Sequence, residues 1–137
     1  MTTPLRALAQ VVLGAFLVLA GTAHLTFART EFRAQVPPWV PLDVDLVVLA
    51  SGVVEICCGA ALLLAWRQPP RAVVGAAVAL LFVAVFPGNI AQLTEHRDAF
   101  GLTSDTSRAV RLLFQPVLVV WALWCTDAVG WWRRRRA

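Results

Sequence analysis

The stretch LVVLASGVVEICCGAALLLAW, residues Leu46–Trp66, decides the fold class. Its 21 residues would form a helix of about 30 Å at a rise of 1.5 Å per residue, which matches the hydrocarbon thickness of a bilayer. The only charged residue in the stretch is Glu55, near its middle. A carboxylate at that depth costs roughly 2.5–3.5 kcal/mol on insertion scales, so its presence requires an explanation.

Three further apolar stretches of 21 or 22 residues accompany it, at 7–28, 72–93 and 112–132. Only 15% of the 137 residues are charged, against about 25% in an ordinary soluble domain, and the mean hydropathy is +0.72. Each stretch is long enough to cross a bilayer. We predict an all-α fold in which residues 1–137 form a single domain, a four-helix transmembrane bundle with up-down-up-down order.

The distribution of arginine predicts the orientation of this bundle. With four spans both termini lie on one side, and that side carries seven of the 12 basic residues and no acidic residue outside the spans: Arg6, Arg67, Arg71 and Arg133–Arg136. Positively charged loops stay in the cytoplasm, so we predict cytoplasmic termini in a plasma membrane such as the bacterial inner membrane. The pI of about 10.2 then reflects topology and contacts with membrane lipids, not nucleic acid.

Five polar side chains of the predicted spans are expected to meet in the outer half of the bundle. Helical side chains lean toward the N-terminus of their helix. Glu55 therefore leans outward from a span that begins outside, whereas His24 and Asn89 lean inward from spans that begin inside. Arg111 and Gln115 are spaced i,i+4 and share one face of the fourth span. These side chains can supply the hydrogen bonds and the positive charge that the Glu55 carboxylate needs inside the membrane.

Prolines also favour an open outer half. Pro87 and Pro116 lie inside the third and fourth spans, where each removes a backbone donor, and we expect them to widen the bundle into a cavity. The loop VPPWVP, residues 36–41, cannot form a regular helix. We expect this loop to roof the cavity through Pro38, Trp39 and Pro41, with the segments 29–45 and 94–107 packed over the bundle mouth.

The inner half is expected to offer only one strongly polar group, Asp127. Cys57 and Cys58 are adjacent within the second span, Cys125 lies in the fourth, and no C-x-x-C spacing occurs. We predict that all three are small buried hydrophobic residues, and the sequence leaves a redox role open. His96 lies in an outer loop between charged residues, where it is expected to be solvated. The chain offers too few ligands for a metal site and lacks two facing histidines for haem.

Several short patterns occur in a fixed order along the chain. They are GTAHLTF at 21–27, FRAQVPPWVP at 32–41, SGVVEICCG at 51–59, VFPGNI at 85–90, and the pair Arg111 and Gln115. Together they resemble the DoxX-like family of small four-helix membrane proteins, although Gly88 stands where that family often has alanine. The family takes its name from a subunit of a thiosulfate:quinone oxidoreductase, and relatives accompany other redox systems. The resemblance implies a redox partner subunit.

Two classes of function remain open. In the first, the chain is the membrane subunit or accessory of a redox system and binds a quinone-like or other lipophilic ligand among His24, Glu55, Asn89, Arg111 and Gln115. In the second, it is a non-catalytic scaffold or assembly factor that acts through partner proteins, and the polar network only holds the helices in register. The sequence leaves open whether the chain is an enzyme, which ligand it takes and whether it forms a homo-oligomer.

Overall fold

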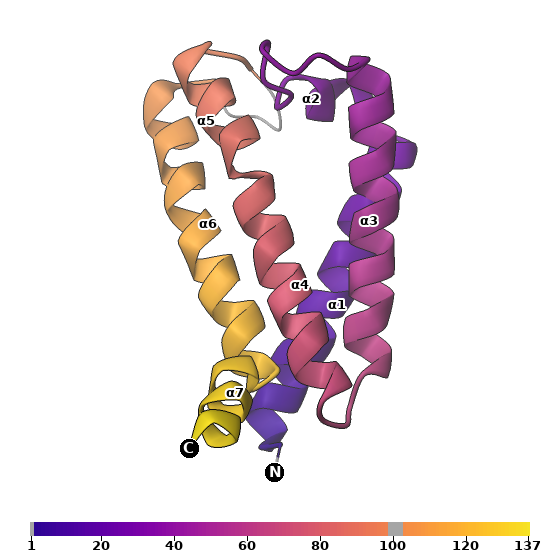
Figure 1. Cartoon of the computed structure of the whole chain (residues 1–137). Coiled ribbons are helices and arrows are strands. Elements are labelled where there is room, and N and C mark those ends of the chain that lie inside the picture. Colours follow the sequence, from indigo (N-terminus) through magenta and orange to yellow (C-terminus); the bar gives the residue numbers. More distant parts are fainter. Residues whose placement is uncertain (1, 99–102) are drawn as a thin grey trace.

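The computed structural model describes residues 2–98 and 103–137, and these residues form helices but no strand (Figure 1). The long helices α1, α3, α4 and α6 form the bundle. Two short helices, α2 and α5, lie toward one end of it, and α7 lies at the other. The bounds are α1 Pro4–Leu25, α2 Arg29–Arg33, α3 Val44–Leu64, α4 Pro70–Ala84, α5 Phe86–Thr94, α6 Asp105–Cys125 and α7 Ala128–Arg136. We name the two ends of the bundle the α2 end and the α7 end.

Four helical segments of this fold are long and apolar enough to cross a membrane, α4 and α5 together forming one of them. Only 22–39% of the residues in their apolar windows are buried. Large apolar side chains cover the outside, and Leu80 and Leu113 are 68% and 72% exposed. A bilayer can cover such a surface, whereas water cannot solvate it cheaply. The predicted all-helical fold with four apolar spans is confirmed in the described part of the chain, as expected for a membrane protein.

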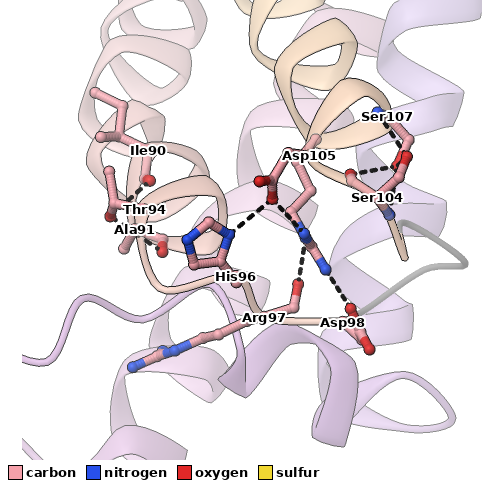
Figure 2. A network of polar contacts seen from close by, with 10 residues as sticks. Ile90, Ala91, Thr94, His96, Arg97, Asp98, Ser104, Asp105 and Ser107 are labelled. Atoms are coloured by element: carbon pink, nitrogen blue, oxygen red, sulfur yellow. Dashed lines mark hydrogen bonds and ion pairs between the residues drawn. The ribbon is translucent and has the colours of Figure 1, made fainter.

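The fourth span was predicted at 112–132, and this boundary is wrong by seven residues at each end, because α6 runs from Asp105 to Cys125. The helix begins early because Ser104 and Ser107 form a reciprocal capping box, visible in Figure 2. It ends early because Asp127 adopts a left-handed conformation with φ of 54°. Trp131 and Trp132 therefore lie on the separate helix α7.

The third span contains a break that the sequence pattern only suggested. Helix α4 ends at Ala84 and α5 begins at Phe86, with Val85 between them. Pro87 cannot donate a backbone hydrogen bond, and the next donor, Gly88 N, bonds three residues back to Val85 O at 3.1 Å. Pro116 has no such effect, because α6 continues through it.

The first and second spans begin slightly earlier than predicted. Helix α1 begins three residues earlier because Thr3 caps it, and α3 begins two residues earlier because Asp43 caps it.

Helices α1 and α3 are in backbone contact along two pairs of facing glycines. A Cβ atom at Gly21 would lie 2.5 Å from the carbonyl oxygen of Gly52, and one at Gly59 would lie 2.6 Å from that of Gly14. Small residues allow such close approach of membrane helices. Helix α4 packs mainly on α6, so the bundle consists of two helix pairs. Figure 1 shows these pairs close together at the α7 end and apart toward the α2 end.

The buried core fills the region where the two pairs meet. Its members come from α1, α3, α4 and α6, and they are Leu13, Leu17, Leu62, Val78, Ala79, Phe82, Ala122 and Cys125.

The three cysteines differ in burial. The prediction that all are buried holds for Cys125, but Cys57 is exposed on the outside of α3 and Cys58 is only partly buried. The position of Cys57 on the helix, facing away from α1, explains the difference.

The glycine contact leads to a prediction about stability. Gly59→Leu should destabilise the bundle by about 1–3 kcal/mol or more, because the new side chain would collide with the backbone of α1. Thermal unfolding of the purified protein in detergent, followed by circular dichroism, would measure the loss. Ala15→Leu is the matched control, since Ala15 is exposed on α1 and the larger side chain there has room. Equal melting temperatures for the two variants would contradict the contact.

Candidate functional site

A cavity of about 660 Å³ lies between the two helix pairs toward the α2 end. Its wall is mostly apolar and includes Leu17, Val48, Phe82 and Leu118. All five polar residues predicted to meet also line it, and they are His24, Glu55, Asn89, Arg111 and Gln115. The volume and the few converging polar groups are typical of a pocket for a small molecule. That these residues bind a ligand remains a prediction.

His24 and Glu55 bring an imidazole and a carboxylate together across the α1–α3 contact. The Nδ1 atom of His24 lies 2.8 Å from the carbonyl oxygen of Ala20 and 3.1 Å from Oε2 of Glu55. A carbonyl oxygen can only accept, so Nδ1 carries a proton and directs it to Ala20. The His24 ring also stacks on Phe32, with 3.3 Å between ring centroids and 15° between the planes. The imidazole is therefore held in one orientation.

Oε2 of Glu55 is left without a hydrogen bond in this arrangement. It is buried, and no donor in the described part of the chain bonds to it. Its approach to His24 Nδ1 is close enough for an ion pair but lacks hydrogen-bond geometry, because the Nδ1 proton points elsewhere. A buried acceptor without a donor costs about 1–3 kcal/mol, and more if it is charged. Among the described residues of α3, this oxygen is a buried acceptor without a donor, and it belongs to a side chain that lines the cavity.

Gln115 organises the opposite wall. Its Nε2 donates to the carbonyl oxygen of Phe82 at 2.9 Å, and its Oε1 accepts from Asn89 Nδ2 at 3.0 Å. Arg111 Nη1 donates to the same oxygen over a longer distance of 3.4 Å. Within the described residues no ion pair joins Arg111 to Glu55, although both line the cavity. A guanidinium and a carboxylate therefore face one space without neutralising each other directly.

The predicted roof is only partly formed as expected. Trp39 lines the cavity, as do Pro37 and Val40. Pro38 instead borders a smaller hollow of about 170 Å³ beside it, and Pro41 lines neither space. This segment does not form a helix, in agreement with its proline content.

The two connecting segments at the α2 end hold each other through Arg97. Its Nη1 donates to the carbonyl oxygens of Ala34 and Val36, at 3.1 and 2.8 Å, and so ties the second segment to the residues that precede the roof. Gln35 Nε2 adds a bond of 3.0 Å to Gln92 Oε1. The described residues of both segments thus pack over this end of the bundle, as the sequence predicts. Residues 99–102 of the second segment lie outside the described residues.

Sequence reasoning overlooked Arg108, which fixes the start of α6. It is 5% exposed, donates to Asp105 Oδ1 at 2.8 Å and to the carbonyl oxygen of Arg97 at 3.0 Å, and pairs with Asp98. Figure 2 shows these acids together with His96, whose Nδ1 lies 2.8 Å from Asp105 Oδ1. The i,i+3 spacing of Asp105 and Arg108 was the available signal. By fixing this end of α6, Arg108 sets the direction of Arg111 and Gln115 farther along the helix.

His96 itself is exposed, as predicted. In the described part of the chain no three side chains of His, Cys, Asp or Glu come together as a metal site would require.

The expectation that the other half of the bundle offers only Asp127 is wrong. Gln10 and Arg71 are 0% and 3% exposed at the α7 end. Gln10 Nε2 donates to the carbonyl oxygens of Leu62 and Ala65, at 2.7 and 2.9 Å, and its Oε1 accepts from Arg71 Nε at 2.7 Å. Arg71 Nη2 donates to the carbonyl oxygen of Cys125 at 2.6 Å. These bonds link α1, α3, α4 and α6, and the partners saturate one another.

Asp127, which is partly buried, forms a second set of polar contacts at the α7 end. It pairs with Arg6 at 3.1 Å and with Arg134 at 2.6 Å, and so holds α7 against the start of α1. Partial burial raises the pKa of Asp127, but the hydrogen bonds and positive charges of Arg134 and Arg6 outweigh that effect and leave the pKa below its ordinary value. The carboxylate stays ionised and keeps the turn after α6 in place.

The bond between Gln10 and Arg71 can be tested by a double-mutant cycle. Arg71→Met should cost about 1–3 kcal/mol of stability, because it leaves buried acceptors on Gln10 and Cys125 without their donor. Gln10→Met should also destabilise the bundle. The double variant should lose less than the sum of the two single losses, since the pair is in direct contact. Additive losses in thermal or chemical unfolding would show that the two side chains act independently.

Comparison with known proteins gives one match. A family model described as a domain of unknown function, DUF8561, matches residues 13–126. Neither the curated proteins nor the solved structures gave a match. The matched segment begins within α1 and ends just after α6, so it includes the second half of the first apolar span, the other three spans and all five polar residues of the cavity. The chain therefore belongs to the DUF8561 family of domains of unknown function.

Proposed function

We propose that this protein binds a quinone-like or other lipophilic ligand in the cavity at the α2 end, as the membrane subunit or accessory of a redox system. One observation carries the proposal. A cavity of about 660 Å³ with a largely apolar wall gathers an imidazole, a carboxylate, a guanidinium and two amides inside a bundle of apolar helices. Ionisable groups within membrane segments are expensive, and function is the usual reason for keeping them.

The arginine distribution supports placing this cavity in the outer half of a bacterial inner membrane. With cytoplasmic termini, the α7 end with its basic tail faces the cytoplasm and the α2 end faces outward. A ligand dissolved in the bilayer can then reach the site from the outer leaflet. Phe16 and Phe114 support such a route, because each lines the cavity and is also at least 50% exposed on the lipid-facing surface.

The contacts of each polar group suggest its part in binding. Arg111 is the donor best placed for a ligand oxygen, because its bond to Gln115 is long. Gln115 and Asn89 already bond to Phe82 and to each other, so they position Arg111. His24 directs Nδ1 to Ala20, which leaves Nε2 to exchange a proton with a ligand. Reduction of a quinone takes up two protons and two electrons, and the electrons would come from a redox partner subunit.

The alternative is a scaffold whose polar network is purely structural. Gln10 and Arg71 show what such a network looks like in this chain, because their donors and acceptors saturate one another at the α7 end. The network at the cavity differs, since Oε2 of Glu55 is buried without a donor among the described residues. The difference favours a ligand site over a structural one.

Binding of a short-chain quinone to the purified protein tests the proposal. His24→Ala and Glu55→Gln should each weaken binding about tenfold or more, which corresponds to about 1.4 kcal/mol, while helicity and melting temperature stay unchanged. His96→Ala and Glu31→Gln are matched controls, because these exposed residues lie away from the cavity. Equal affinity in the wild type and all four variants would favour the scaffold.

Cysteine labelling tests the orientation independently. In a background without the three native cysteines, Arg33→Cys should react with a membrane-impermeant thiol reagent in intact cells, because the residue lies in α2 on the predicted outer side. Ala137→Cys should react only after the membrane is permeabilised. Labelling of position 137 in intact cells would reverse the orientation and place the cavity on the cytoplasmic side.

A further inference from the structure

The open acceptor on Glu55 constrains the chemistry of the ligand. Oε2 of Glu55 is buried on the cavity side of α3 and has no hydrogen-bond donor in the described part of the chain. A carboxylate oxygen can only accept, so the group that completes this site must donate a proton into a hydrogen bond.

Three other donors that line the cavity are bonded to other acceptors. Ser51, one turn earlier on α3, directs its hydroxyl to the carbonyl oxygen of Val48 at 3.0 Å. His24 directs Nδ1 to Ala20 at 2.8 Å. Across the cavity, Asn89 Nδ2 donates to Gln115 at 3.0 Å. Rotating any of these three groups toward Glu55 would break an existing bond, so none of the three supplies the missing donor at no cost.

Arg111 adds a complementary requirement on the same cavity. It forms no ion pair with Glu55 within the described residues, and its one hydrogen bond there, to Gln115, is long at 3.4 Å. A guanidinium can only donate hydrogen bonds, so a ligand beside Arg111 must offer it an acceptor. The cavity therefore presents one unmet acceptor and one cation with a single long hydrogen bond, within a largely apolar lining that suits a ring or a hydrocarbon chain.

We propose that the ligand of this cavity carries a hydroxyl group on an apolar ring, as phenols and hydroquinones do, and that this hydroxyl donates to the carboxylate of Glu55, which turns its buried oxygen toward the cavity, while a ligand oxygen accepts from Arg111. This inference rests on the proposed function and narrows its ligand class. A quinone has carbonyl acceptors only and can satisfy Arg111 but not Glu55. The site therefore binds the hydroxyl-bearing form more tightly than the form with carbonyl groups alone.

A matched pair of redox-inert probes tests this chemistry without electron transfer. The pair is a 4-alkylphenol and its methyl ether, which share ring and tail but differ in the single donor. Binding to the purified protein in nanodiscs is measured by titration and corrected for partition into protein-free nanodiscs. The wild type should bind the phenol at least about tenfold more tightly than the ether.

Variants assign that preference to Glu55. In Glu55→Gln the phenol-to-ether ratio should fall to within about threefold, because the amide also offers a donor to the ether oxygen. Glu31→Gln, an exposed carboxylate outside the cavity, should keep the wild-type ratio. The ratio of phenol affinity to ether affinity in the wild type tests the proposal even if Glu55→Gln fails to fold. Equal binding of phenol and ether, or tighter binding of the ether, overturns this inference while leaving lipophilic binding intact. Absence of saturable binding for both probes and for a short-chain quinone overturns the proposed function as well.

Discussion

Polar groups inside a hydrocarbon layer need partners from the protein, because no water is present to replace a missing hydrogen bond. This constraint organises the bundle at two levels. At the α7 end, Gln10 and Arg71 bond to each other and to carbonyl groups of two further helices, α3 and α6. At the α2 end, Gln115 and Asn89 are satisfied, but Glu55 retains a buried oxygen without a donor in the described residues. The polar contacts at the α7 end hold the helices together, whereas the unsatisfied oxygen at the α2 end can accept a hydrogen bond from another molecule.

The space for that molecule follows from backbone geometry. Facing glycines bring α1 and α3 into contact along their length, so these two helices behave as one layer. The second pair, α4 and α6, meets this layer through the core near the α7 end. Toward the α2 end, the break before Pro87 starts α5, and the pairs diverge (Figure 1). The polar side chains line the resulting cavity because they lie on the inner faces of the diverging helices.

Hydropathy and side-chain direction were sufficient to predict that four helical spans occur and which five polar residues line the cavity. Span length is set by the bilayer, and the N-terminal lean of helical side chains placed Glu55, His24 and Asn89 at similar depth. Local capping was harder to anticipate. Ser104 and Asp127 moved the fourth span, because a capping box and a left-handed residue override the edges of an apolar stretch. Arg71 was considered only as a signal of orientation, and Gln10 was not considered, whereas the helices bury both side chains.

Native mass spectrometry of the protein purified from its own membrane tests the central claim most directly, namely that the cavity holds a lipophilic ligand. We expect a retained small molecule at about one copy per chain, apolar and bearing a ring hydroxyl, which is lost from a variant with Glu55 and Arg111 replaced together. Retention of phospholipid alone, in equal amounts by the wild type and that variant, would contradict the account and assign the polar cavity residues a structural role.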